Sequence, residues 1–181
     1  MNIFYLSECP VEAAQYQCDK HVVKMILESA QMLCTAHHAC PTDAQRPEKF
    51  YKQAHLNHPS TIWVRTTTGN YDWMIDHALA LCEEYTHRYG KIHASQSIIK
   101  WCADNIPSIP EGQQTKMPQC MPDRFKDDDS VTAYRHFYNV DKRNSFKCVW
   151  TNRSEPNWWK NSIHSSDHYN SDPIPESLLG V

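Results

Sequence analysis

The sequence predicts a mainly α-helical fold, and three observations lead to that expectation. Apolar residues recur at helical spacing in several long segments, whereas the alternation typical of strands is rare. Only 4 of the 181 residues are glycine, while 40% are hydrophobic. The 11 prolines fall mostly outside the periodic segments, which favours helices joined by rigid loops. A chain of this length can bury a full core as one domain without disulfide bonds.

The first long helix is expected near the N-terminus. A short apolar segment, residues 2–6, leads to Pro10, which suits the first position of a helix. The apolar spacing then continues to about His38, so we expect one continuous helix over this range. A polar loop follows at residues 41–47, and residues 48–56 are expected to form a short helix.

A second long helix is expected to begin at Pro59 and to reach Tyr89. Residues 66–70 have weak helical character and predict a bend or break. Beyond this point, apolar residues from Tyr71 onward share one face, and Gly90 suits the position that terminates a helix.

The remainder of the chain alternates short elements with loops. Residues 94–104 predict a further short helix, and the proline-rich stretch 105–125 predicts an extended surface loop. An acidic run precedes a third helix at 130–138, because negative charge favours a helix N-terminus. Residues 145–151 are expected to be extended, and 155–160 to form an aromatic turn.

We therefore expect one helical domain over residues 1–163. Residues 164–181 are rich in Ser, Asn and Pro and contain no Lys or Arg, which predicts a loosely ordered acidic tail. No segment approaches the roughly 18 apolar residues of a membrane span, so no membrane association is expected. The N-terminus also lacks the pattern of a secretory signal, and an intracellular protein is expected.

The first helix is predicted to carry a reactive stripe. At 100° per residue, His21, Lys24, Glu28 and Gln31 fall on one face, and a base, an amine and a carboxylate thus stack along successive turns. The same spacing also suits an ordinary solvated face with a Lys–Glu pair, and both interpretations stay open. The opposite, buried face is expected to contain Val22, Val23, Ile26, Ala30 and Leu33.

The charge distribution favours a nucleic-acid partner more than the formal net charge of −3 does. Segment 134–160 contains six Lys and Arg residues against two acidic ones, interleaved with aromatic residues. This pattern suits phosphate contact together with base stacking. A packed aromatic core with a charged rim would give the same pattern.

The eight cysteines are expected to be free thiols, and no metal site is predicted. Two Cys-x-x-His pairs, Cys18/His21 and Cys34/His37, lie 16 residues apart, or about 24 Å along one continuous helix. A zinc ion binds its ligands at about 2.0–2.3 Å and cannot reach both pairs. A glycine-rich phosphate loop is also missing, so we expect no cofactor.

Five motifs in order carry a family resemblance: CDKHVVKMILESAQML, HPSTIWVR, CEEYTHRYGK, MPQCMPDRF and TNRSEPNWWK. They resemble small proteins encoded in tailed-phage genomes, over nearly residues 1–160. More distantly, their arrangement is similar to the phage pyrimidine-dimer DNA glycosylase/AP lyase, also called endonuclease V. The resemblance implies a mainly α, single compact helical domain of the pyrimidine-dimer glycosylase type with long Pro-rich loops.

The catalytic residues of that family transfer poorly to this sequence. The family attacks the sugar with the amine of an N-terminal threonine, exposed by removal of Met1, and a carboxylate on the first helix assists. Here residue 2 is Asn2, whose large side chain disfavours removal of Met1. A rough alignment places Lys24 or His21 near the family's carboxylate, with Glu28 one turn further on. The resemblance therefore implies altered chemistry or a fold reused for recognition.

We expect three catalytic residues. Lys24 would supply the amine that forms a Schiff base, Glu28 would stabilise the developing sugar cation, and His21 would act as acid or base. Phosphate is expected at Asn57 and His58, where a helix begins. The full predicted substrate- and nucleic-acid-binding set is Asn2, Gln31, His55, Asn57, His58, Arg65, His87, Arg88, Arg135, Trp158 and Lys160.

The sequence thus favours an enzyme that excises or processes a modified or damaged pyrimidine base in DNA, in the cytoplasm of an infected bacterial cell. Two alternatives remain. The chain could be a transferase that modifies bases or nucleotides of phage DNA, or a non-catalytic nucleic-acid-binding protein of the same fold.

Overall fold

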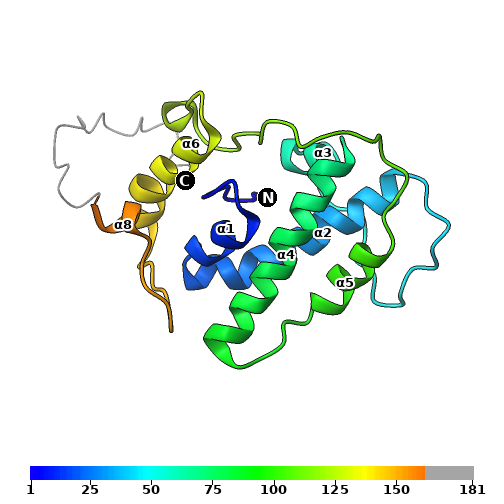
Figure 1. Ribbon diagram of the computed structural model, residues 1–181, viewed down its shortest axis with the longest axis horizontal. Coiled ribbons are helices and arrows are strands. Elements are labelled where there is room, and N and C mark those ends of the chain that lie inside the picture. The colour runs from blue at the N-terminus through cyan, green and yellow to red at the C-terminus, as the bar shows by residue number, and fades with distance from the viewer. Residues whose placement is uncertain (162–181) are drawn as a thin grey trace, which may run out of the picture.

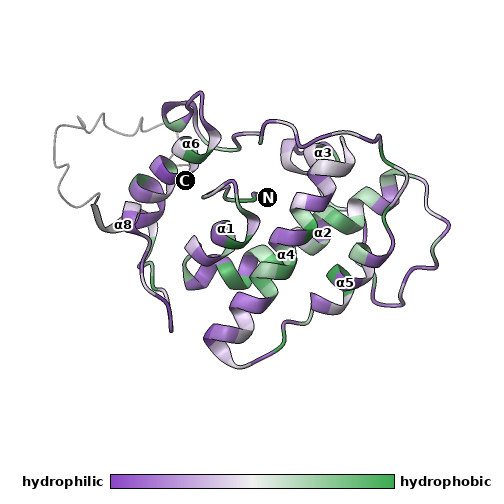
Figure 2. Cartoon of the chain, in the orientation of Figure 1, coloured by the Kyte–Doolittle hydropathy of each residue, from purple (hydrophilic) through white to green (hydrophobic). Residues whose placement is uncertain are grey.

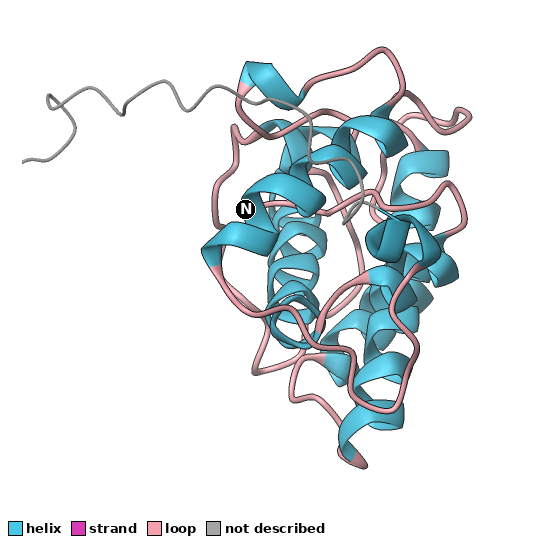
Figure 3. Ribbon diagram, turned by 90° about the vertical axis from the view of Figure 1, so that its left-hand side faces the viewer, coloured by secondary structure: helices cyan, strands magenta, loops and turns pink. Residues whose placement is uncertain are grey.

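A computed structural model of the chain describes residues 1–161, and the expected mainly helical fold is confirmed (Figure 3). No strand occurs within this range, and none of its helices has the length and apolar character needed to cross a membrane. The predicted tail, residues 164–181, lies outside the described residues.

The first predicted helix is two helices, α1 (Pro10–Tyr16) and α2 (Asp19–Ala39), so the expectation of one continuous helix was wrong. Gln17 and Cys18 between them have extended backbone angles. The amide of Cys18 donates to the Tyr138 hydroxyl at 3.0 Å, and that of Asp19 to the Val149 carbonyl at 2.8 Å. Because these amides bond to distant parts of the chain, the helix restarts at Asp19.

The second predicted helix is divided at the predicted break, into α3 (Pro59–Val64) and α4 (Thr68–Tyr89). The Thr67 side chain caps α4 by accepting a hydrogen bond from the Asn70 amide at 3.2 Å. Gly90 ends α4 with a φ of 64°, a left-handed conformation that glycine adopts without steric cost.

The short helix expected at residues 48–56 is absent, which is a second correction. Side chains of α2 bind the backbone of this segment instead. The Thr35 hydroxyl donates to the Ala54 carbonyl and accepts from the Ala54 amide, and His38 Nε2 contacts the Tyr51 carbonyl at 2.9 Å. These side-chain bonds replace the backbone bonds that a helix would have made.

Two further predicted helices are confirmed, as α5 (Gln96–Asp104) and α6 (Ser130–Phe137). The predicted extended segment at 145–151 forms no strand. The remaining described elements are short: the 3₁₀ helix η1 (Asp123–Phe125), the π-helical turn η2 (Tyr138–Lys142), α7 (Arg143–Ser145) and α8 (Asn157–Asn161).

Helix α4 lies at the centre of the packing, against α1, α2 and α5 (Figure 1). Figure 2 shows hydrophobic residues concentrated where these helices meet. The buried face of α2 includes Val22, Ile26, Ala30 and Leu33, as predicted, each 0% exposed. Val23 is an exception, because its side chain is 41% exposed, beside Lys24 on the outer face.

The proline-rich loop 105–125 runs back over the start of α4, and Gly69 permits this close approach. The Gly69 amide donates to the Gly112 carbonyl at 2.9 Å, and the Thr115 amide donates to Asn70 Oδ1 at 2.7 Å. A Cβ atom at residue 69 would lie 2.5 Å from the Gln114 backbone nitrogen. The absence of a side chain at Gly69 therefore positions the loop.

We expect Gly69→Ala to displace this loop and to lower the free energy of unfolding by about 1–3 kcal/mol, as overpacking against backbone does. Urea denaturation would measure the loss. Gly112→Ala is the matched control, because its Cβ would meet only the side chain of Thr67, at 3.1 Å or more. Wild-type stability of Gly69→Ala would contradict the packing constraint.

Candidate active site

The N-terminal segment is buried in the middle of the molecule, although it forms no regular secondary structure (Figure 1). Side chains from several elements bind its backbone. Gln17 donates to the Ile3 carbonyl at 3.1 Å, and Arg135 Nε of α6 donates to the Leu6 carbonyl at 2.9 Å. Trp73 of α4 donates to the Glu8 carbonyl at 2.8 Å. The start of the chain is thus held in a defined position.

A carboxylate of α2 lies against the nitrogen of residue 2. The Asn2 backbone N–H donates to Glu28 Oε2 at 2.9 Å, while Lys24 Nζ lies 3.4 Å from Glu28 Oε1. The Glu28 side chain is 12% exposed and that of Lys24 is 66% exposed. One half-buried carboxylate therefore faces two nitrogen atoms, and the lysine is open to solvent.

The surroundings of Asn2 come from three parts of the chain. Its Nδ2 donates to the Cys120 carbonyl at 3.0 Å, and its Oδ1 accepts from the Ile3 amide at 2.8 Å. Met1 packs against the core, and the Thr61 hydroxyl of α3 donates to its sulfur at 3.5 Å. The predicted binding residue Asn2 therefore uses its side chain to fix the segment, while its backbone nitrogen faces Glu28.

Glu28 is the carboxylate of α2 that lies beside the nitrogen of residue 2, whereas the sequence alignment placed Lys24 or His21 near the family's carboxylate. Asp19 is the other carboxylate of α2, and it binds the Thr151 hydroxyl at 2.6 Å and Arg88 at 2.8 Å. Asp19 and Glu28 are the two acidic residues of α2. The sequence does not show that Asp19 is bound to Thr151 and Arg88, so it could not single out Glu28.

His21, predicted to act as acid or base, lies in the core with 7% exposure. Its ring stacks on Phe4 at 4.2 Å between centroids, and its Nδ1 shares a 2.6 Å hydrogen bond with the Tyr138 hydroxyl. Phe146 covers the ring edge-on at 5.4 Å. This packing points to a structural contribution, since the ring holds Phe4 and thereby the N-terminal segment.

His58 caps the start of α3, where phosphate was predicted to bind. Its Nδ1 accepts from the Ser60 amide at 3.2 Å, and α3 has only six residues. Burial chiefly lowers the pKa of His58; the chain's first amine and His55 lower it further, and Glu28 opposes them.

Other predicted binding residues around α3 differ in accessibility. His55 and Asn57 are exposed, and His55 has a φ of 49°. Arg65 donates to the carbonyls of Thr61 and Leu56, each at 2.8 Å, so its guanidinium holds the chain that precedes α3. Gln31 is half-buried on α2, one turn beyond Glu28.

Arg88 was predicted to bind substrate, and the structure removes it from that set. Its side chain is 0% exposed, and it binds Glu84 at 2.7 Å and Asp19 at 2.8 Å. Arg153 binds the same Glu84 carboxylate. A buried arginine between two carboxylates is satisfied internally and cannot reach a phosphate. His87, one residue earlier, is exposed and contacts the Asn152 carbonyl at 2.9 Å.

The predicted aromatic and basic residues of the C-terminal part form a separate cluster. The Arg135 guanidinium lies 5.7 Å from the Tyr16 ring and 5.6 Å from the Trp158 ring. Trp158 is half-buried and also packs edge-on against Tyr138. Lys160 falls within α8, but its side chain lies outside the described part of the structure. Arg135 and Trp158 thus belong largely to the packing of the domain.

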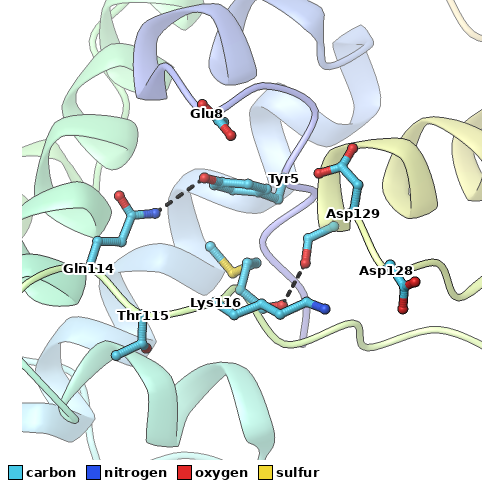
Figure 4. A pocket seen from close by; sticks show the side chains of 9 residues that line it. Tyr5, Glu8, Gln114, Thr115, Lys116, Asp128 and Asp129 are labelled. Atoms are coloured by element: carbon cyan, nitrogen blue, oxygen red, sulfur yellow. Dashed lines mark hydrogen bonds between the residues drawn. The ribbon is translucent and has the colours of Figure 1, made fainter.

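A polar hollow of about 410 Å³ lies between the N-terminal segment and the proline-rich loop (Figure 4). The Gln114 amide donates to the Tyr5 hydroxyl at 3.2 Å, and carboxylates of Glu8, Asp128 and Asp129 line the hollow. This acidic lining disfavours phosphate. Within residues 1–161, no three His, Cys, Asp or Glu side chains gather as a metal-ligand set would.

Comparison with known protein families identifies the chain. The family described as pyrimidine dimer DNA glycosylase matches residues 1–97, more than half of the 181. The chain belongs to this family. The matched part contains residue 2, Lys24 and Glu28, which lie together near the N-terminus. No match was found among curated proteins or among solved structures.

A buried histidine of α4 supports the position of the N-terminal segment. His77 of α4 is 0% exposed, its Nδ1 lies 3.0 Å from the Pro10 carbonyl, and its Nε2 lies 3.2 Å from Gln17 Nε2. Nδ1 must carry the proton to bind a carbonyl, so Nε2 accepts from Gln17. The other hydrogen of this amide goes to the Ile3 carbonyl. These hydrogen bonds require the neutral form of the His77 imidazole.

The stability of the protein is expected to fall between pH 6.5 and 4 through His77. Burial lowers its pKa from 6.5 to about 4 in the folded chain, so the unfolded chain binds a proton first as the pH falls. Above pH 6.5 the protein has the full stability contribution of neutral His77. Between pH 6.5 and 4 the free energy of unfolding falls by about 1.4 kcal/mol per pH unit. Urea denaturation at several pH values would show a shallower dependence in His77→Asn than in the wild type. An unchanged dependence in that variant, with His87→Asn as control, would contradict the assignment.

Proposed function

We propose that this protein excises a modified or damaged pyrimidine base from DNA, with Glu28 as its catalytic carboxylate. The observation that carries the proposal is the 2.9 Å contact between Glu28 and the nitrogen of residue 2. In the family to which the chain belongs, a carboxylate on the first helix works beside the amine of residue 2. Because the sequence resembles phage proteins, we propose phage DNA as the substrate, in the cytoplasm of an infected bacterium.

Base excision of this kind needs a primary amine. The amine attacks C1′ of the sugar, the bond between C1′ and the base breaks, and a Schiff base forms after ring opening. The base leaves with a proton, and the carboxylate stabilises the positive charge that develops on the sugar. The half-buried Glu28 suits this electrostatic task, because a partly desolvated charge acts more strongly than one in water.

Lys24 supplies the amine in this proposal. With Met1 in place, the nitrogen of residue 2 is an amide, whose lone pair is delocalised and cannot attack. The large side chain of Asn2 disfavours removal of Met1. The Lys24 amine lies 3.4 Å from the other oxygen of Glu28 and is exposed to an incoming sugar. Glu28 would accept a proton from this amine and pass it to the departing base, which restores the carboxylate as positive charge develops on the sugar.

His21 has a positioning role in this arrangement. Its stacking on Phe4 holds the N-terminal segment against α2. DNA would approach the exposed face of α2, where Lys20 and Lys24 offer positive charge to phosphate and Val23 and Leu27 offer apolar surface to a base.

Glu28→Gln is expected to lower the rate of base release by about 100-fold to 10,000-fold, the usual contribution of a catalytic acid or base. The protein should remain folded, because the glutamine oxygen can still accept from the Asn2 amide. Base release would be measured by mass spectrometry of nucleosides from damaged, hydroxymethylated and plain DNA.

Glu83→Gln is the matched control, since it removes an exposed carboxylate of α4. Wild-type base release by Glu28→Gln would overturn the role of Glu28. If no substrate releases a base but a nucleoside changes in mass, the result would instead favour a base-modifying transferase. Binding without any chemical change would favour a non-catalytic DNA-binding protein.

Lys24 is expected to form the covalent intermediate, which borohydride reduction traps as a stable protein–DNA adduct. Lys24→Ala and Lys24→Arg should both abolish the adduct, and Lys24→Arg should retain DNA binding because its charge is kept. Peptide mapping of the wild-type adduct would locate the modified amine. An adduct that persists in both variants and maps to the chain's first amine would assign the reaction to that amine instead.

A further inference from the structure

Two apolar side chains project from the outer face of α2, outside the hydrophobic core of residues 1–161. Val23 is 41% exposed and Leu27 is 39% exposed. Neither side chain belongs to the core cluster of the domain. Valine is also a weaker helix former than the lysine or glutamate that usually occupies such an exposed position. The packing of the domain therefore does not explain this pair.

The apolar pair borders the candidate active site. At 100° per residue, Val23 and Leu27 lie about 40° apart around the helix, and Leu27 lies about 60° from Lys24. Residues three or four positions apart on a helix have Cβ atoms about 5–6 Å from each other. Lys24 therefore stands between Leu27 on one side and Glu28, 3.4 Å from its amine, on the other.

Positive charge flanks the apolar pair. Lys20 precedes Val23 by one helical turn, and its Nζ lies 4.7 Å from the centroid of the Phe146 ring. The Lys24 side chain is 66% exposed. Lysines beside apolar side chains are complementary to DNA, because the ammonium groups pair with phosphates while the apolar groups contact bases. A symmetric contact with a second copy of this chain would instead bring like charges together.

The proposed attack on the sugar needs an opened base stack. Enzymes that act on a base take its nucleotide out of the duplex, and the cost is the lost stacking and pairing. Proteins that unstack a base step commonly insert an apolar side chain between the bases. Leu27 is exposed, apolar and adjacent to the Lys24 amine, so it is placed for such an insertion.

We propose that Val23 and Leu27 form an apolar wedge that enters the base stack of duplex DNA, next to the nucleotide whose sugar Lys24 attacks. Leu27 separates the bases, Val23 covers the neighbouring base, and Lys20 holds a phosphate of the same strand. The purpose of the wedge rests on the proposed base excision, but insertion is a binding step without covalent change. Duplex DNA, in preference to a single strand, is therefore the substrate.

The experiment measures unstacking in a DNA that the protein cannot process. The probe is a duplex with a tetrahydrofuran analogue of an abasic site, which has no base to release and cannot form a Schiff base. The neighbouring base is 2-aminopurine, whose fluorescence rises when it leaves the stack. We expect a several-fold rise when the full-length wild-type protein saturates this duplex. The double variant Val23→Ala, Leu27→Ala should give little or no rise at saturation.

The chain contains matched controls for this loss. Val11 of α1 is 45% exposed and Ile62 of α3 is 43% exposed, so Val11→Ala and Ile62→Ala remove comparable apolar side chains away from the outer face of α2. Both controls should keep the wild-type rise. Lys20→Ala should need more protein to saturate the duplex and should still give the rise at saturation. Thermal unfolding followed by circular dichroism would show that all these variants remain folded.

Several results would overturn the wedge. They are a saturated duplex without a rise in fluorescence, a rise that persists in the double variant, and a duplex that the protein does not bind. A wild-type dimer that becomes a monomer in the double variant, seen by analytical ultracentrifugation, would assign the apolar pair to self-association instead. Because base release is measured on other DNA, a failed wedge leaves the test of base excision intact, and absent base release leaves the fluorescence test intact.

Discussion

A buried N-terminal segment without regular secondary structure is the constraint on which the rest of this structure depends. Backbone amides and carbonyls that leave water must be satisfied by other groups, and a segment outside a helix cannot satisfy its own. Here Gln17, Trp73 and Arg135 donate to the carbonyls of the segment, and Glu28 accepts from the amide of residue 2. The positions of α2, α4 and α6 are therefore linked to the position of the chain's first residues.

The buried N-terminal segment also positions the side chains of the candidate site. Glu28 is held half-buried by the amide it binds, and its second oxygen faces the exposed amine of Lys24. The family match covers residues 1–97, but later residues complete the support. The Cys120 carbonyl binds the Asn2 side chain, and the Tyr138 hydroxyl binds His21. The part of the chain outside the family match thus fixes the geometry of the part inside it.

Several elements were predictable because their signals are local. The periodicity after Tyr71 gave the long α4, and Gly90 ended it with the left-handed conformation that its position requires. Asp129 caps α6 with two hydrogen bonds to backbone amides. The predictions failed where distant groups intervene. The first helix divides because the Tyr138 hydroxyl and the Val149 carbonyl, about 120 and 130 residues further along the chain, bind the amides of Cys18 and Asp19.

The sequence by itself determined the helical class and the family, and it predicted which residues share the polar face of α2, because these depend on residue types and their spacing along the chain. Only the tertiary structure decided which of those residues meet. It placed Glu28 beside residue 2, buried His21 against Phe4, and enclosed Arg88 between two carboxylates. Helical spacing sets the direction of a side chain but not its partner, and the partner is chosen by the segments that pack against it.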